Sequence, residues 1–232
     1  MKKLFKVLIF LVLIGMSIAL LFIGNGYNIY KEAINANPLE EKVEEIRAKE
    51  NYTEFSELPQ MYVNAVISVE DKRFYKHNGM DIIAIGRAAI NDVKAMKYVE
   101  GGSTITQQLA KNMYFTQEKK LERKIAEVFM AWKIENNYSK EDIFELYVNS
   151  IFFGDGYYTV KEACNGYFNK DLDEMTDYEC ILLAGIPNAP SVYAPTKNPD
   201  LAKQRQRQVM EKMIENKYLT QKEASEILEQ EE

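Results

Sequence analysis

An uncharged apolar run lies near the N-terminus of this chain, from Val7 to Ile23. Three lysines come before this run: Lys2, Lys3 and Lys6. As a helix, the run would be about 26 Å long at about 1.5 Å per residue, slightly shorter than a bilayer core of about 30 Å. Flanking residues or modest thinning of the bilayer can make up the difference. We therefore expect residues 1–24 to contain a short cytoplasmic stub and a membrane-spanning helix.

A cleaved signal peptide is the alternative interpretation of this run. No small-x-small cleavage site precedes the polar sequence, because an apolar tetrapeptide ending at Ile23 directly follows Ala19. We therefore favour an uncleaved signal anchor that crosses the cell membrane once. Because positive charges in front of a span favour the cytoplasm, the N-terminus is expected inside and the remaining chain outside, in the periplasmic or extracellular space.

The pattern beyond the anchor predicts a mainly α fold. Residues 25–57 are rich in Asn, Glu and Lys with weak apolar spacing, so they are expected to form a linker whose helices are exposed. From Leu58 to residue 232, helical periodicity dominates, with a short strand at most at residues 150–153. Several residues are suited to start or cap helices: Pro59, Asp81, Thr116, Ser139, Thr176 and Thr220. The helix after Thr116 is expected to turn one apolar stripe to the core: Leu121, Ile125, Val128, Phe129 and Trp132.

Composition excludes some functions. The net charge of −6 argues against a nucleic-acid partner. One histidine and two cysteines are too few for a zinc site built from these residues. Cys164 and Cys180 lie on predicted apolar helix faces, where two buried thiols are favoured and a disulfide stays open.

A glycine-led segment, residues 101–112, predicts a helix that begins at Ser103. Its apolar stripe consists of Ile105, Leu109 and Met113, and a second face carries Thr104, Gln107, Gln108 and Lys111. Free N–H groups and the dipole at such a helix start can bind an anion. A capped amphipathic helix with a solvated polar face fits the same pattern.

Two carboxylates are candidates for chemistry. Glu70 ends an apolar helix, where burial would raise its pKa and make it a usable base. The alternative is a surface carboxylate that is paired with Arg73 or Lys72. Glu127 lies four residues after Arg123 and three after Lys124, spacings that also form ordinary helix ion pairs.

Four ordered motifs resemble those of the family 51 glycosyltransferases, the peptidoglycan polymerases found alone or fused to penicillin-binding transpeptidases. They read ED-x-x-F-x-x-H-x-G from Glu70, G-S-T-I-T-Q-Q-L-x-K-N from Gly102, R-K-x-x-E from Arg123, and Y-x-N-x-x-x-x-G from Tyr147. The resemblance covers roughly residues 58–199. It implies a lysozyme-like, two-lobed helical domain, which we assign to residues 58–232.

The resemblance implies the polymerisation of lipid II, with inversion at the donor sugar and release of undecaprenyl pyrophosphate. In it, Glu70 matches the general base and Glu127 the second essential carboxylate. The residues expected to bind substrate are Asp71, Phe74, His77, Ser103, Thr104, Thr106, Gln107, Gln108, Lys111, Asn112, Arg123, Lys124 and Asn149. For Asn149, a buried structural hydrogen bond is the favoured alternative. The expected partners are lipid II, the growing glycan strand, the membrane and other cell-wall synthesis proteins.

No cofactor is required, although a divalent cation, Mg²⁺ or Mn²⁺, assists some relatives, and the sequence shows no dedicated metal ligands. No Ser-x-x-Lys is present and little chain follows the motifs, so a transpeptidase domain is not expected. A lysozyme-like glycan hydrolase and an inactive membrane-anchored scaffold are the alternatives. Apolar residues around the central motif are expected either in the core or, for some, dipping into the membrane: Met96, Tyr98, Met113, Tyr114 and Phe115.

Overall fold

The structure is a computed structural model that describes residues 2–95, 101–116, 118 and 120–229. It is mainly helical, which confirms the predicted fold class. The expected strand at residues 150–153 is wrong, since the described residues contain only an isolated bridge between Gly154 and Tyr157. Met96 and Tyr98 lie outside the described residues.

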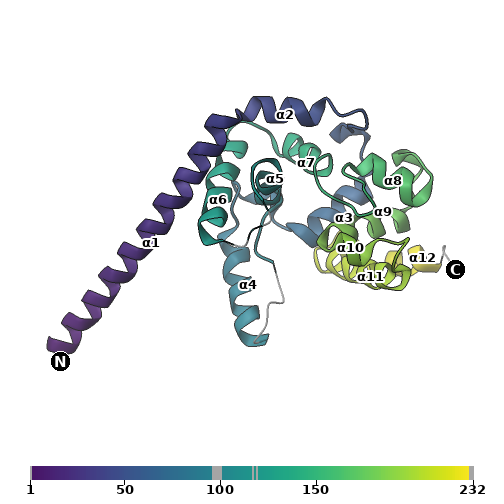
Figure 1. The fold of residues 1–232 in the computed structure, drawn as a ribbon. Coiled ribbons are helices and arrows are strands. Elements are labelled where there is room, and N and C mark those ends of the chain that lie inside the picture. Colours follow the sequence, from purple (N-terminus) through teal and green to yellow (C-terminus); the bar gives the residue numbers. More distant parts are fainter. Residues whose placement is uncertain (1, 96–100, 117, 119, 230–232) are drawn as a thin grey trace.

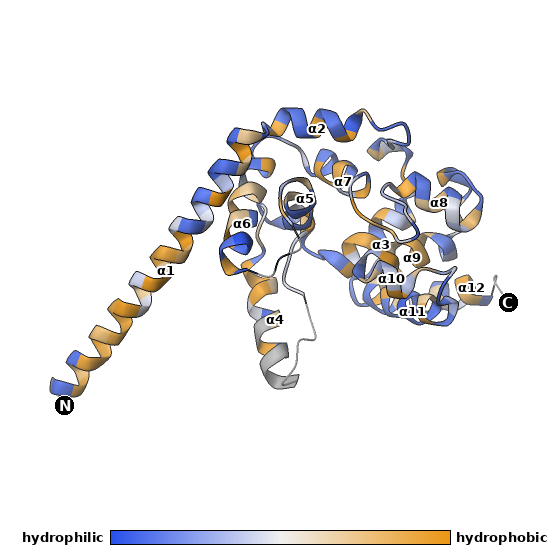
Figure 2. Ribbon diagram, viewed as in Figure 1, coloured by the Kyte–Doolittle hydropathy of each residue, from blue (hydrophilic) through white to orange (hydrophobic). Residues whose placement is uncertain are grey.

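The predicted membrane helix is part of α1 (Lys2–Ala36), which continues well past Ile23. It is the one helix of the described residues that is long and apolar enough to cross a membrane. In Figure 1 its N-terminal half projects away from the body of the molecule, and Figure 2 shows that this half is the apolar one.

Residues 25–57 are more ordered and more buried than the sequence suggested. They contain the end of α1, then α2 (Leu39–Arg47) and the short 3-10 helix η1 (Phe55–Glu57). Leu39, Val43 and Ile46 are buried, and α2 packs against α7 (Lys140–Val148). The expectation of exposed helices is therefore wrong, because three apolar residues at positions i, i+4 and i+7 are enough to bury one face of a short helix.

The larger part of the core lies around α3 (Gln60–Glu70), which packs on α9 (Asp177–Gly185) and α11 (Pro199–Glu215). Smaller elements complete this part: α8 (Val160–Phe168), η3 (Leu172–Glu174), η4 (Ile186–Asn188), α10 (Pro190–Tyr193) and α12 (Gln221–Glu229). A second group consists of α5 (Ile105–Tyr114), α6 (Leu121–Glu135) and α7. Figure 1 shows α4 (Ile82–Ala95) extending from the body toward the same side as the N-terminal half of α1.

Local capping signals were the most reliable guide to helix starts. Asp81 accepts a hydrogen bond from the N–H of Ala84, and Ser139, Thr176 and Thr220 accept from the N–H three residues on. Two predictions were wrong. The central helix begins at Ile105 with Thr104 as its N-cap instead of Ser103, and α6 starts at Leu121 without a side-chain cap from Thr116.

The prediction for the core face of α6 is also wrong. Leu121 is 57% exposed and Trp132 39% exposed. The side of α6 that is buried in the body of the domain carries Ala126, Glu127, Met130, Ala131 and Ile134. The predicted stripe fails because two of its members, Ile125 and Phe129, pack on α1 instead.

Both cysteines are free and buried, which confirms the favoured prediction of two buried thiols.

Candidate active site

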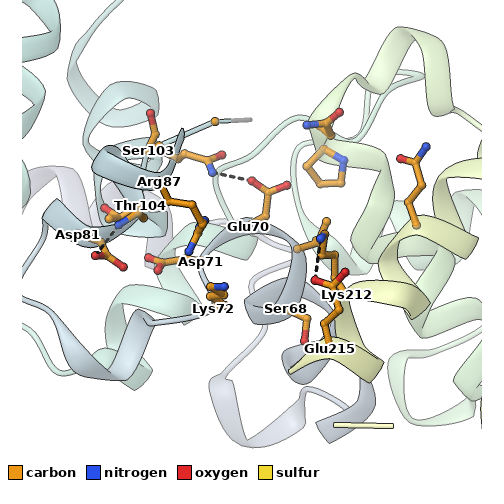
Figure 3. A pocket seen from close by; sticks show the side chains of 18 of the residues that line it. Ser68, Glu70, Asp71, Lys72, Asp81, Arg87, Ser103, Thr104, Lys212 and Glu215 are labelled. Carbon is orange, nitrogen blue, oxygen red and sulfur yellow. Dashed lines mark hydrogen bonds and ion pairs between the residues drawn. The ribbon is translucent and has the colours of Figure 1, made fainter. Parts of the chain in front are cut away.

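A cleft of about 770 Å³ lies where the C-terminal end of α3, the segment before α5, and α11 face one another. Figure 3 shows Glu70 between the N-terminal end of α5 on one side and the α11 residues on the other. Glu70 is the last residue of α3, whose preceding turns are buried in the core. The carboxylate is therefore held at the edge of an apolar wall, as predicted.

Glu70 is fixed by a hydrogen bond from α5. The side-chain amide of Gln108 donates to Oε2 of Glu70 at 2.7 Å, and the hydroxyl of Tyr147 donates to Oε1 of Gln108 at 3.3 Å. Burial raises the pKa of Glu70, and the negative charge of Asp71 adds to this rise. The hydrogen bond from Gln108 and the positive charges of Arg205 and Lys111 oppose the rise without cancelling it. The result is a positioned carboxylate with an increased affinity for a proton.

A second pocket of about 210 Å³ contains Glu127. The residues that line both pockets are Ser103, Gln108 and Lys111. Glu70 and Glu127 thus lie in adjoining hollows that share one wall, formed by α5 and the residue before its N-cap.

Glu127 is fully buried and is held by two cations of its own helix. Arg123 forms an ion pair with Oε1, and Nζ of Lys124 lies 2.7 Å from Oε2. The same Nζ donates to Oγ of Ser103 at 2.6 Å, which ties α6 to the segment before α5.

The second pocket has more positive than negative charge. Burial and the positive charges of Arg123 and Lys111 lower the pKa of Lys124 to about 8. Burial and the charge of Arg123 also lower the pKa of Lys111. Three cations around one carboxylate leave a net positive site that would gain by binding an anion.

Asp71 and His77 serve the structure of the loop after α3. The carboxylate of Asp71 accepts hydrogen bonds from Nε2 of His77 at 2.9 Å and from the N–H of Ile105 at 3.1 Å. Both side chains are almost completely buried, at 3% and 4% exposure. This contact attaches the end of α3 to the start of α5, so it sets the distance between Glu70 and the shared wall.

Replacing Asp71 with asparagine should therefore destabilise the domain. Asparagine keeps one acceptor oxygen but loses the charge that strengthens both hydrogen bonds, so we expect the free energy of unfolding to fall by about 1.5–3 kcal/mol. Thermal and urea unfolding of the purified protein measure this change. Lys72→Ala, an exposed neighbour, is the control. An unfolding free energy equal to that of the wild type would contradict the structural role.

Several other predicted substrate-binding residues have partners within the protein. Thr104 caps α5 and donates to the carbonyl of Gly79 at 2.7 Å, Gln107 completes the capping box, and Thr106 donates to Glu135 at 2.6 Å. Asn149 is fully buried and bonds to the backbone of Thr53.

Phe74 is fully buried in the core, and Asn112 is exposed outside both pockets. Thr104 and Asp71 line the large cleft, and Gln107 lines the small pocket. Phe74, His77, Thr106, Asn112 and Asn149 line neither. The predicted contacts of these residues with substrate remain predictions.

Helices α11 and η4 supply the opposite wall of the cleft, which was not predicted from the sequence. Its lining residues include Asn188, Arg205, Gln208 and Lys212. Arg205 acts on the candidate base, because its charge lowers the pKa of Glu70. In sequence, Arg205 stands in a run of alternating Arg and Gln that is typical of a solvated helix face.

Among the residues that the structure describes, no cluster of three or more His, Cys, Asp or Glu side chains is arranged to hold a metal ion. Assistance by Mg²⁺ or Mn²⁺ stays a prediction.

Two carboxylates beside cations, in adjoining pockets of a helical fold, are an arrangement that enzymes acting on glycosidic bonds use. The family model for the transglycosylases matches residues 37–214, so the chain belongs to the transglycosylase family.

Similar curated proteins include penicillin-binding protein 1F of Bacillus subtilis (strain 168), which is 40% identical over 238 residues, 96% of this chain and 33% of the relative. Penicillin-binding protein 1A of Aquifex aeolicus (strain VF5) is 45% identical over 172 residues, 74% of this chain and 24% of the relative. This chain therefore spans a third or less of the length of these relatives. The crystal structure of penicillin-binding protein 1A from Haemophilus influenzae aligns with a TM-score of 0.46 and 22% identity, over 76% of this chain and 17% of that one.

Proposed function

We propose that the protein polymerises lipid II into glycan strands as a peptidoglycan glycosyltransferase. The observation that carries this proposal is the shared wall between the two pockets. A positioned carboxylate with a raised pKa, Glu70, lies on one side of Ser103, Gln108 and Lys111, and a cationic hollow around Glu127 lies on the other. Displacement of a diphosphate from a sugar requires both a base for the attacking hydroxyl and positive charge for the leaving group.

In the proposed step, Glu70 accepts the proton of the acceptor sugar's 4-hydroxyl while that oxygen attacks the anomeric carbon of the donor strand. A carbon–oxygen bond forms on one face, and the bond to the diphosphate oxygen breaks on the other with its electron pair. The configuration at the anomeric carbon inverts, and the lipid diphosphate leaves. General base catalysis of this kind contributes typically about 10²–10⁴-fold to a rate.

The cations stabilise the leaving diphosphate. Arg123 can bind two oxygens at once, and Lys111 and Lys124 add point charges beside it. Glu127, which pairs with Arg123 and Lys124, fixes both side chains in place before substrate arrives. Such preorganised charges are most effective at the position where negative charge develops.

A lysozyme-like hydrolase is the alternative within enzymes. A hydrolase would activate water and shorten glycan, and it has no use for three cations beside the second carboxylate. Incubation of the full chain with lipid II in detergent separates the two. Growth of a glycan polymer supports the proposal, while degradation of added glycan without growth supports the hydrolase. Binding of cell-wall proteins without turnover would support an inactive scaffold.

The pH profile of polymerisation should be bell-shaped. Glu70 works as a base only when deprotonated, so a raised pKa moves the acid limb above the pH expected of an ordinary glutamate. Lys124 must be protonated, so activity should fall as the pH rises through about 8. Initial rates of lipid II consumption between pH 4 and 10 measure both limbs.

The variant Lys124→Arg tests the alkaline limb, because a guanidinium stays charged far above this range. We expect the limb to move to higher pH. The matched control is Lys133→Arg, on the same helix and outside both pockets. An alkaline limb unchanged in Lys124→Arg would mean that another group causes it.

The proposed substrate requires access to the membrane. Besides α1, the described part of α4 exposes apolar side chains, with Ile82 at 71%, Ile83 at 60% and Ile90 at 56%. Met113, Tyr114 and Phe115, in contrast, are partly buried against the core. We therefore assign the surface that dips into the membrane to α4.

Because lysines precede the apolar run, we assign the catalytic domain to the outer side of the cell membrane. Protease treatment of intact spheroplasts tests this: cleavage supports the topology, and protection contradicts it.

A further inference from the structure

The anchor helix and α6 are in unusually close contact at Gly26. A Cβ atom at this position would lie 2.6 Å from Cβ of Ile125 and 2.9 Å from the carbonyl oxygen of Glu122. Real Cβ atoms do not approach other atoms this closely, so any larger residue would push the two helices apart. Gly26 is buried, whereas the preceding part of α1 is almost entirely exposed.

Ring contacts extend this interface along both helices. Tyr27 and Tyr30 lie 5.3 Å and 6.0 Å from Phe129 between ring centroids. As α1 advances from residue 26 to 30, its neighbours on α6 advance from residues 122 and 125 to 129, so the two helices run side by side in the same direction. The start of α6 therefore lies nearest to the apolar run.

This register relates the cations to the end of the apolar run. Ile23 is three residues before Gly26, or about 4.5 Å along a helix. Arg123 and Lys124 are immediate neighbours of the α6 residues that Gly26 contacts. They also line the second pocket. The cationic hollow consequently lies close to the level at which α1 changes from apolar to polar residues.

We propose that the α1–α6 contact at Gly26 sets the height of the cationic hollow above the membrane, level with the lipid head groups. This inference rests on the proposed function. A diphosphate joined to a polyprenyl chain lies at the head-group level, because its tail stays in the bilayer. Gly26 is then a positioning residue, since it acts through α6 and touches no substrate itself.

The test lengthens α1 between Ile23 and Gly24 with a seven-residue helical segment of Ala and Gln. Seven residues are close to two turns, so the phase of the helix changes by about 20° while the domain rises by about 10 Å. The α1–α6 contact is preserved. The matched control carries the same segment between Lys3 and Leu4, before the apolar run. Polymerisation of full-length lipid II is measured in phosphatidylglycerol liposomes and in detergent micelles.

We expect the insertion after Ile23 to lower the rate in liposomes at least tenfold relative to the control insertion, with equal rates in detergent. An eleven-residue segment, close to three turns, should lower it further. Energy transfer from Trp132, the single tryptophan, to a dansyl-labelled lipid head group gives a readout independent of activity. The insertion after Ile23 should reduce this transfer, and the control insertion should not.

Equal liposome rates for the insertion and the control would overturn the inference. Loss of activity in detergent by the seven-residue and eleven-residue insertions after Ile23 would overturn it as well. In that case, lengthening α1 would itself disturb the α1–α6 contact. Absence of polymer from the wild-type protein in detergent is a different result, and it would refute the proposed function.

Discussion

Glu70→Gln should reduce lipid II polymerisation by about 10³-fold or more while the domain stays folded. Glutamine has the shape of glutamate but cannot accept the acceptor's proton, and general bases contribute typically about 10²–10⁴ to a rate. In the structure, the carboxylate accepts a hydrogen bond from Gln108 and has a raised pKa caused mainly by burial. A neutral amide at this position relieves that burial cost, so stability should be unchanged or slightly higher.

The measurement is the initial rate of polymer formation from lipid II, with circular dichroism and thermal unfolding of the same preparations. Glu41→Gln, an exposed glutamate at the start of α2, is the matched control and should keep the wild-type rate. If Glu70→Gln polymerised within threefold of the wild type, Glu70 could not be the base.

Glu127→Gln should reduce both activity and stability. Glu127 is fully buried, and its removal leaves Arg123 and Lys124 beside Lys111 without a counter-charge. Loss of one partner from a buried ion pair typically costs about 3–5 kcal/mol. Because Lys124 is 42% exposed, solvent screens part of this cost, and we expect the free energy of unfolding to fall by about 1–3 kcal/mol. We expect the polymerisation rate to fall by about 10²-fold or more, because the displaced cations no longer match the diphosphate.

Urea unfolding and steady-state kinetics separate these two effects. At urea concentrations below the unfolding transition, the loss of activity should appear mainly in kcat, since the cations act on charge that develops as the diphosphate leaves. Glu122→Gln, on the same helix and outside both pockets, is the matched control. Wild-type kinetics with reduced stability would leave Glu127 a purely structural role.

The sequence predicted the parts of this molecule that local signals determine. Capping by Thr176 and Ser139 depends on residues three apart, so it is visible without a fold. The position of Glu70 at the end of an apolar helix, and of Gln108 and Lys111 one turn apart on one face, likewise follows from helical spacing.

Contacts between distant segments were not predictable in the same way. The partner of Ile125 and Phe129 is α1, about a hundred residues earlier, and no local pattern reveals it. The same holds for Arg205, which looked like a solvated residue until α11 was placed against α3.

Polar residues posed a different difficulty. Thr106 and Asn149 carry side chains that can bind either a substrate or the protein itself. Only the fold shows that Thr106 donates to Glu135, and only the fold identifies the backbone of Thr53 as the partner of Asn149. A motif identifies which residue types are present, but burial decides which of them remain available to a ligand.

In the proposed mechanism, a base and a diphosphate site face each other across the wall of Ser103, Gln108 and Lys111. An experimental structure of full-length Glu70→Gln in a lipid bilayer with lipid II bound would show whether the substrate lies across this wall. We expect diphosphate oxygens within hydrogen-bond distance of Lys111, Arg123 or Lys124, and an acceptor 4-hydroxyl within hydrogen-bond distance of the residue 70 side chain. A diphosphate bound away from all three cations, or a 4-hydroxyl out of reach of residue 70, would contradict it.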